Sequence, residues 1–528
     1  MIYFLTDWQS EMDRLESNIL FNVNKIFNEG GIETKMINTQ FSPFSNYFTN
    51  HFEFYDSDHF INLLDAVTDR FSLCYAPLTL KDLEFPKTWE KVYTRNNVLL
   101  TKDGEVKAEV FFNSFGFVSQ VHYLSSLGKE IDIYSEKGVV LLKQKFNNDG
   151  EKVEQQIFDE GGQLILTEWN DYVFIDNSYN SHFKRSTYHT FKEVCMELVN
   201  SSLVNFNPKE DRLIIDGTSN WLMELIEAFQ YPESIVYIFT GSTVECLSQL
   251  NHHLQFIEKG RSIITDNIHF LNELKRNDFY PLKNKLRFIP LYPTTLMLGE
   301  SNTYLEEYVY WQIEQFDSQI SALFQEFLQM KLEVRDLCLI IDIKEEEDEK
   351  KIKMLLESFI VKNFEVILTS PGYELVKKYY EALRNEEMTA GLKEQFQKFK
   401  KEDKEFSRII ESYLFYTGIS FKKNVDFQEL KTAFGKVRVF IDQREKYEFL
   451  SHSLAVSAGI PILSKKASPY LINGKNGILY KNIKEVIEGV KDYLSDHDLW
   501  NKNLVESVEL IEINSANGLL EKWKENLK

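Results

Sequence analysis

The stretch HSLAVSAGIPILSK, residues 452–465, decides the fold of the second half of this chain. Its first part is an apolar run that predicts a short helix, and its last part predicts a strand. Between them lie Gly459 and Pro461. Glycine tolerates the left-handed backbone of a helix C-cap, and proline stops a helix from continuing. A helix that gives way to a strand over so few residues is typical of an α/β protein.

Apolar runs of strand length recur on both sides of this junction, and helical patterns separate many of them. The first half contains IYFL (2–5), RLIIDG (212–217), SIVYIFTG (234–241), SIITD (262–266) and LRFIP (286–290). The second half contains LCLIIDI (337–343), FEVILTS (364–370), VRVFIDQ (437–443) and IPILS (460–464). Helices are expected before Gly30 and over about 301–331. Runs this uniformly apolar suit parallel sheets covered on both faces, so they predict an α/β fold with two Rossmann-type domains facing a cleft.

From about residue 88 to residue 175 the pattern changes to short alternating segments separated by glycine turns. The turn glycines are Gly104, Gly116, Gly128, Gly138, Gly150 and Gly161. Asp-Gly and similar pairs between period-two segments signal tight hairpins, and the even spacing predicts one antiparallel β-meander. The predicted domains are a discontinuous N-terminal Rossmann-like domain (1–87 and 176–300), the inserted meander (88–175), and a C-terminal Rossmann-like domain with terminal helices (301–528).

Composition limits the partners and the compartment. The chain has 528 residues, of which 43% are hydrophobic, and a formal net charge of −21. A surface this acidic repels phosphate backbones, so we expect no nucleic-acid partner. Four scattered cysteines form no disulfide framework, and no apolar run resembles a signal peptide or approaches the ~18–20 residues of a transmembrane segment. These features predict a cytoplasmic protein.

The junction around Gly459 also carries positions that hold the donor in retaining glycosyltransferases of the GT-B fold. In those enzymes one glutamate stands five residues before the glycine, and another stands eight residues before the first. The corresponding residues here are Leu454 and Lys446. A leucine side chain accepts no hydrogen bond from a ribose hydroxyl, and a lysine inverts the charge. Glu445 and Glu448 lie close to Lys446 and could replace that glutamate, but no acidic residue stands near Leu454 in the helix.

A second segment, PLYPTTLMLGES (290–301), keeps the frame of a donor-binding segment but not its charges. Related active enzymes have an Asp and an Arg where this chain has Pro293 and Thr295. A leaving diphosphate needs cations or a helix N-terminus to stabilise its charge. A glycine-rich loop after the first strand is also absent from the sequence, because no glycine occurs before Gly30. These features predict a vestigial donor cleft that includes Lys446, Leu454, Gly459, Pro461, Lys465, Lys466, Gly299 and Ser301.

Motifs for metal or nucleophilic chemistry are weak. Asp56-Ser57-Asp58 resembles the metal-holding motif of the other glycosyltransferase fold, but it lies in a polar loop of a chain with two Rossmann-like halves. His252 and His253 are neighbours on a predicted helix, where adjacent side chains point about 100° apart and cannot share a metal. No GxSxG, HExxH or P-loop motif occurs. We therefore expect no catalytic residue, no metal and no cofactor.

Scattered pieces of the chain carry a family resemblance. They are YFLTDW (3–8), WEKVYTRNNVLL (89–100), the meander, LGES (298–301), FIDQ (440–443), SAGIPILSKKASPYLINGKNGILY (457–480) and YLSDHDLWNKNL (493–504). With them the chain resembles the glycosyltransferase-like family of accessory Sec proteins, the first of three Asp proteins that support export of serine-rich glycoprotein adhesins in Gram-positive bacteria.

The resemblance implies a GT-B shell with an inserted β-domain and no transferase activity. It implies two companion accessory Sec proteins, one acetyltransferase-like and one small and carbohydrate-module-like. It also implies an accessory SecA motor, a glycosylated adhesin as substrate, and a peripheral position at the inner face of the membrane when the protein is bound to the export machinery.

Two main functions remain open from the sequence. The first is a non-catalytic adaptor in adhesin export. The second is an active transferase that modifies Ser/Thr of the adhesin from a UDP-sugar, with Glu445 or Glu448 and a clamp formed by Lys465 and Lys466. The remaining alternative is an unrelated sugar-binding or regulatory α/β protein.

Overall fold

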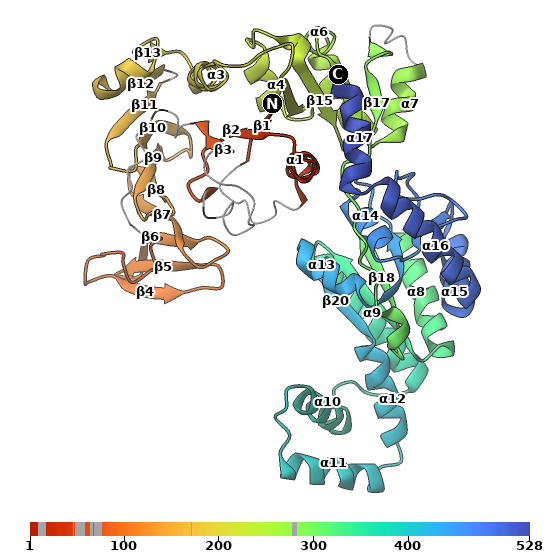
Figure 1. Ribbon diagram of the computed structural model, residues 1–528. Coiled ribbons are helices and arrows are strands. Elements are labelled where there is room, and N and C mark those ends of the chain that lie inside the picture. Colours follow the sequence, from red (N-terminus) through yellow and green to blue (C-terminus); the bar gives the residue numbers. More distant parts are fainter. Residues whose placement is uncertain are drawn as a thin grey trace.

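A computed structural model describes residues 1–8, 17–45, 47, 59–63, 67, 76–170, 172–276 and 282–527. The described residues form three sheets with helices packed around two of them (Figure 1). Asp56-Ser57-Asp58, and with them most of the loop expected over 40–60, lie outside the described residues.

The first sheet is parallel and has seven strands in the order β17-β16-β15-β14-β1-β2-β3. They are β1 (Ile2–Thr6), β2 (Thr34–Asn38), β3 (Phe60–Asn62), β14 (Arg212–Asp216), β15 (Ile235–Phe239), β16 (Ser262–Thr265) and β17 (Leu286–Phe288). Its helices are α1 (Ile19–Glu29), α3 (Phe191–Ser202), α4 (Asn220–Ile226), α5 (Thr243–His252), α6 (Leu254–Ile257) and α7 (Ile268–Arg276). The central strands β1, β14 and β15 are buried along most of their length, which explains their uniformly apolar sequences.

The second sheet is the predicted meander: ten antiparallel strands pair in chain order from β4 to β13. They are β4 (Glu90–Tyr93), β5 (Asn97–Lys102), β6 (Glu105–Phe112), β7 (Val118–Ser125), β8 (Gly128–Tyr134), β9 (Val140–Phe146), β10 (Lys152–Phe158), β11 (Leu164–Trp169), β12 (Tyr172–Ile175) and β13 (Thr187–Tyr188). Turn glycines such as Gly104 and Gly116 have positive φ angles of 81° and 82°, which favour glycine. Strand β13 continues this sheet past residue 175, where the sequence placed the end of the meander. The boundaries of the three domains remain a prediction.

The third sheet is parallel and has six strands in the order β20-β19-β18-β21-β22-β23. They are β18 (Glu307–Ile313), β19 (Leu337–Ile343), β20 (Ile419–Lys422), β21 (Val437–Asp442), β22 (Ile462–Ser464) and β23 (Gly477–Leu479). Its helices include α8 (Ser318–Glu333), α9 (Glu346–Phe364), α13 (Phe427–Phe434), α14 (Leu450–Ser457) and α15 (Ile483–Ser495).

Two expectations for this half are wrong. The segment 301–331 was expected to be helical, but its first part contains strand β18, and the helix α8 begins only at Ser318. The sequence EYVYWQI is rich in β-branched and aromatic residues, and it pairs with β19 and β21. The strand expected at 364–370 is absent from the structure, since α9 continues to Phe364 and the next residues form a turn.

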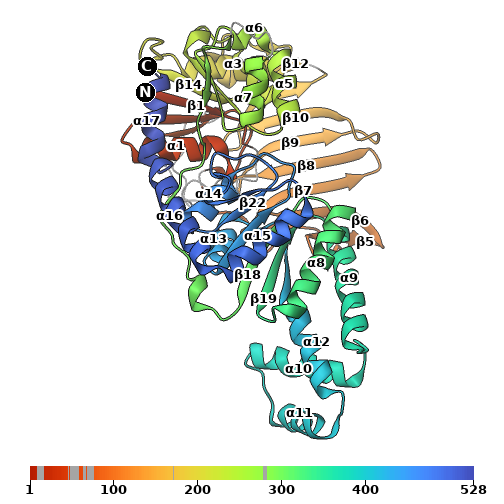
Figure 2. The same ribbon diagram turned by 90° about the vertical axis from the view of Figure 1, so that its right-hand side faces the viewer.

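Helices outside the sheets give the molecule its outline. The helices α10 (Pro371–Arg384), α11 (Ala390–Glu402) and α12 (Phe406–Thr417) extend the C-terminal half away from the rest of the chain (Figures 1 and 2). At the C-terminus, α16 (His497–Ile513) and α17 (Ala516–Leu527) return to the first half, where Trp523 packs edge-on against Phe27 of α1. No helix among the described residues is long and apolar enough to cross a membrane.

Candidate functional site

A cavity of about 320 Å³ opens where strands of the third sheet end. It lies beside the ends of β18 and β19, the loop after β21 and the start of α14, and Ser17 reaches it from the first half of the chain. Strand pairing places Gln312, Asp342 and Asp442 at matching positions on three adjacent strands. Ligands of parallel α/β sheets bind at the carboxyl ends of the strands, so this cavity is the candidate site.

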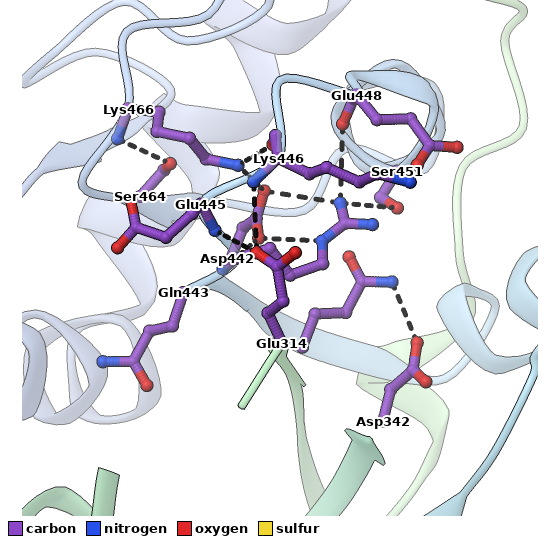
Figure 3. A network of polar contacts seen from close by, with 12 residues as sticks. Glu314, Asp342, Asp442, Gln443, Glu445, Lys446, Glu448, Ser451, Ser464 and Lys466 are labelled. Atoms are coloured by element: carbon purple, nitrogen blue, oxygen red, sulfur yellow. Dashed lines mark hydrogen bonds and ion pairs between the residues drawn. The ribbon is translucent and has the colours of Figure 1, made fainter. Parts of the chain in front are cut away.

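The fully buried carboxylate of Asp442 lies beside the cavity and holds three basic side chains. Arg444 donates from Nε to Oδ1 at 3.0 Å, His452 Nε2 lies 2.9 Å from Oδ2, and Lys466 Nζ lies 3.2 Å from Oδ2. Part of this network is drawn in Figure 3. Burial disfavours the charge of Asp442, but Arg444, the hydrogen bond from His452 and Lys466 outweigh burial and hold the pKa of Asp442 well below its usual range. Arg444 and Lys466 therefore have an internal counter-charge.

The ring of His452 is neutral in this network. Burial lowers its pKa, and the hydrogen bond to Asp442 offsets that effect only in part. Its Nδ1 is buried without a hydrogen-bond partner in the described part of the chain, so a proton there would have no acceptor. The single proton of the ring is accordingly assigned to Nε2, where it is donated to Asp442.

The loop after β21 is fixed from two sides. The Glu314 carboxylate accepts backbone N–H groups of Glu445 at 2.7 Å and of Lys446 at 3.3 Å, and it points toward this loop in Figure 3. On the other side Lys466 donates to the backbone oxygen of Lys446, and Lys465 forms an ion pair with Glu445. Lys465 lies beside a separate hollow of about 490 Å³ rather than in the candidate site.

Asp342 and Gln312 form the polar pair at the end of β18 and β19. Gln312 donates from Nε2 to Asp342 Oδ2 at 2.9 Å, and the Tyr310 hydroxyl donates to the same oxygen at 3.0 Å. Burial raises the pKa of Asp342, and these two hydrogen bonds offset part of that increase. Gln312 is 5% exposed, and its Oε1 has no hydrogen-bond partner among the described residues.

Of the eight residues predicted to form a donor cleft, Lys446 lines the cavity. Leu454 is 6% exposed and belongs to a hydrophobic core shared by the two halves. Lys465 and Lys466 are held by Glu445 and Asp442 as described above.

The remaining four residues are structural. Gly459 has a φ of 73°, and its backbone closes the end of α14. Pro461 accepts a ladder hydrogen bond from Phe440, and Gly299 donates its N–H to Ala458. Ser301 is buried at the start of a short 3-10 helix. The segment 291–299 thus runs along α14 and connects the two halves, without lining the cavity.

The polar lining residues that sequence reasoning missed include Gln312, Glu314, Asp342 and Arg444. Asp342 and Arg444 stand at the end of a predicted strand or just after one, which is a usable signal, whereas Gln312 and Glu314 lie in the segment that was expected to be helical. Their convergence depends on the pairing register of β18, β19 and β21, and that register is set by tertiary packing.

Comparisons with known proteins agree on fold and family. The family model for the first Asp protein of the accessory Sec system matches residues 4–528. A curated relative with that description from Streptococcus gordonii is 21% identical over 99% of this chain and 95% of its own length. A solved structure of accessory secretory proteins 1, 2 and 3 of Streptococcus pneumoniae contains a chain that is 18% identical, with a TM-score of 0.75 over 100% of this chain and 99% of that one.

The pneumococcal O-GlcNAc transferase GtfA, solved with UDP and GlcNAc, is 13% identical, with a TM-score of 0.64 over 100% of this chain and 98% of that chain. The predicted GT-B-like fold is therefore confirmed. Because the family model covers nearly the whole sequence, this chain belongs to the accessory Sec family of the first Asp protein, whose members have a glycosyltransferase-like fold.

Proposed function

We propose that the chain is a non-catalytic adaptor of accessory Sec export and that its donor cleft has lost the ability to bind a nucleotide sugar. The observation that carries this proposal is that basic side chains near the cleft form ion pairs with carboxylates of the protein itself. Asp442 holds Arg444 and Lys466, and Glu445 holds Lys465. A diphosphate needs positive groups that are free to face it, because transfer depends on stabilising the charge of the leaving group.

The remaining charges of the cavity also disfavour a diphosphate. Its lining contains the carboxylates Glu314, Asp342, Asp426 and Glu448. Lys344 and Lys446 are lining cations for which the structure gives no ion-pair partner within the described ranges. Two exposed lysines among four carboxylates give a weak attraction for a group with two or three negative charges.

The position that would hold the donor ribose points to the same function. Leu454 is apolar and buried in the core between the two halves, so it offers no acceptor to a hydroxyl. Restoring a carboxylate there would place a charge in an apolar core.

The partners follow from the family. The structure of the S. pneumoniae relative is described as accessory secretory proteins 1, 2 and 3, so we propose that this chain binds two companion accessory Sec proteins. In the same proposal it acts with an accessory SecA motor on a glycosylated serine-rich adhesin. It does so in the cytoplasm, at the inner face of the membrane when it is engaged with the export machinery.

One observation favours the alternative, an active UDP-sugar transferase that modifies Ser/Thr of the adhesin. Glu448 lines the cavity two residues from the predicted donor position Lys446, and a structural neighbour is an O-GlcNAc transferase. A carboxylate in that place is the group on which this function would depend.

Co-expression with the two companions tests the proposal. The adaptor function predicts a complex of fixed stoichiometry on gel filtration. When this complex is mixed with a Ser/Thr-rich adhesin peptide, it should consume no more UDP-GlcNAc or UDP-glucose than a control that contains the peptide without the complex. Turnover that disappears in the Glu448→Gln variant, with the complex still intact, would establish the transferase instead.

A further inference from the structure

The outer face of the β11–β12 hairpin carries aromatic side chains where polar residues are expected. On the inner face, Leu166 and Val173 are buried in a hydrophobic core that they share with the first sheet. On the outer face, Trp169, Tyr172 and Phe174 are 54%, 44% and 42% exposed. The solvent side of an antiparallel sheet is ordinarily polar, and a group of exposed aromatic residues marks an interaction surface.

The pairing register places these aromatic side chains beside one another. Trp169 on β11 is directly opposite Tyr172 on β12, and residues that are directly opposite in an antiparallel pair share a face. The ring of Tyr172 lies 6.4 Å from that of Phe174 and 5.3 Å from that of His189, which follows β13. We call these four side chains the aromatic platform, and they lie at the β13 end of the meander (Figure 1).

The platform also has free hydrogen-bond donors. Within the described residues, the indole Nε1 of Trp169 and the hydroxyl of Tyr172 have no hydrogen-bond partner. An indole N–H can only donate, and a phenol hydroxyl can donate or accept. A polyproline II segment has no internal hydrogen bonds, so its backbone carbonyls are free to accept from such groups. The platform therefore has donors where a ligand of this kind has acceptors.

The surface next to the platform is basic. The segment 182–189 contains two histidines, Lys184 and Arg185, and it contains no acidic residue. Lys184 forms no ion pair within the described part of the chain, and Arg185 lies 3.9 Å from Glu193. Glu154, which is directly opposite Trp169, is already held by a lysine of β9 at 2.9 Å. In a chain with a net charge of −21, this local excess of positive charge favours a ligand with acidic side chains.

Ligands of other backbone geometry match this surface less well. An amphipathic helix binds in a hydrophobic groove, and a β-strand adds to the edge of a sheet rather than to its face. Single-stranded nucleic acid also stacks on aromatic residues, but the net charge of −21 and the neighbouring Glu154 repel its phosphates. A polyproline II segment packs its proline rings on exposed aromatic side chains and needs no groove of helical width.

We infer that the aromatic platform binds an acidic, proline-containing segment of another protein in the polyproline II conformation. The proline rings pack on Trp169 and Tyr172, whose indole N–H and hydroxyl donate to backbone carbonyls of the segment. The acidic side chains of the segment lie toward Lys184 and Arg185. This interaction uses the meander and not the cavity at the third sheet, so it does not depend on whether the donor cleft is active.

Fluorescence anisotropy of labelled peptides with the full-length protein tests the inference. The main probe is a run of prolines with acidic residues at both ends. One matched probe has alanines in place of the prolines, and another has lysines in place of the acidic residues. The main probe is expected to bind about tenfold more tightly than either matched probe, since both kinds of contact contribute. Non-specific attraction to a chain of net charge −21 would instead favour the lysine probe.

Variants connect the binding to the platform. Trp169→Ala is expected to weaken binding of the main probe about tenfold, because aromatic anchors dominate such interfaces. Lys184→Glu is expected to weaken it about threefold at low salt and less at high salt, as for a charge at the rim of an interface. Tyr93→Ala, at a 70% exposed position on β4 at the other end of the meander, is the matched control and should leave binding unchanged. All three positions are exposed, and unchanged melting temperatures would verify that the variants fold normally.

Each opposing result overturns the inference in a different way. Equal binding of the proline and alanine probes, or no binding of any probe, would exclude recognition of polyproline II. Binding that Trp169→Ala leaves unchanged would place the peptide elsewhere. Sedimentation with phosphatidylglycerol vesicles that is lost in Trp169→Ala would make a lipid surface the occupant, and displacement of the probe by methyl N-acetyl-α-glucosaminide would make it a sugar. The adaptor function is tested separately, by complex formation and by consumption of UDP-sugars.

Discussion

Arg444 donates from Nε to the carboxylate of Asp442 at 3.0 Å, and Asp442 is completely buried at the end of β21. Its side-chain neighbours His452 and Lys466 complete the network. This arrangement gives Arg444 and Lys466, which lie beside the candidate site, a structural function.

Replacing Asp442 should therefore destabilise the fold strongly. Asp442→Asn leaves Arg444 and Lys466 without their counter-charge, and breaking a buried pair by removing one partner costs about 3–5 kcal/mol. Denaturant unfolding measures the change in the free energy of unfolding. Glu445→Gln, which removes the exposed partner of Lys465, is the control and should remain close to the parent protein. Equal stability of the two variants would contradict the structural role of the network.

The neutral ring of His452 makes stability depend on pH. Burial lowers the pKa of His452 in the folded protein. Below about pH 6.5 the unfolded state therefore binds a proton more readily than the folded state does, and this difference favours unfolding. Stability should fall as the pH drops below about 6.5 because of this group. His452→Gln, which can still donate to Asp442, should lose less stability below that pH in thermal unfolding. An identical pH profile for both proteins would show that folding does not change the pKa of His452.

Asp266 has the opposite pH dependence. It follows β16, is 2% exposed, and its Oδ1 has no hydrogen-bond partner in the ranges that the structure describes. Burial raises its pKa to about 8, so the folded state retains a proton that the unfolded state loses near pH 4. Stability is lost from this group as pH rises between those values.

Asp266→Asn removes that loss and should stabilise the protein by about 1–3 kcal/mol at pH 7.5, with little effect near pH 4. Melting temperatures at the two pH values measure this difference. Asp336→Asn, at an exposed position, serves as the control and should change neither value. Destabilisation by Asp266→Asn at pH 7.5 would mean that the carboxylate is ionised and satisfied.

The glycine of the helix-to-strand junction should tolerate no side chain. Gly459 has a φ of 73°, and a Cβ there would lie 2.3 Å from Cδ1 of Leu504 on α16. Gly474 has a φ of 77° with nothing within 4 Å of an added Cβ, so it isolates the backbone cost of about 1–2 kcal/mol. Gly459→Ala should lower the melting temperature clearly more than Gly474→Ala, and equal effects would mean that Leu504 moves aside freely.

Much of this fold could be predicted from the sequence, because many of its strands and turns have a recognisable local pattern of apolar, polar and glycine residues. The apolar strands β14, β15 and β21 and the glycine turns of the meander are visible as residue periodicity. Strand β18 was predicted as helix, since its apolar and aromatic residues carry no alternation and lie beside a true helix. Strands β20 and β23 are short and were missed.

The candidate site could be predicted only in part. Lys446 was found because it stands at a known distance from Gly459 in the chain. Gln312, Asp342 and Asp442 belong to strands that are far apart in sequence, and their convergence follows from pairing register. Lys465 and Lys466 were predicted as a possible clamp, but the sequence contains no sign that Glu445 and Asp442 hold them.

Thermal unfolding with and without millimolar UDP tests the central claim most directly. A ligand at about 100 times its Kd stabilises the folded state by about 2.7 kcal/mol, which is a readily measured shift in melting temperature. A cleft in which Asp442 holds Arg444 and Lys466, and in which carboxylates surround Lys344 and Lys446, predicts no shift. A clear shift with UDP that is lost in the Lys446→Met variant would show that the cleft still binds the donor nucleotide, and would contradict the account.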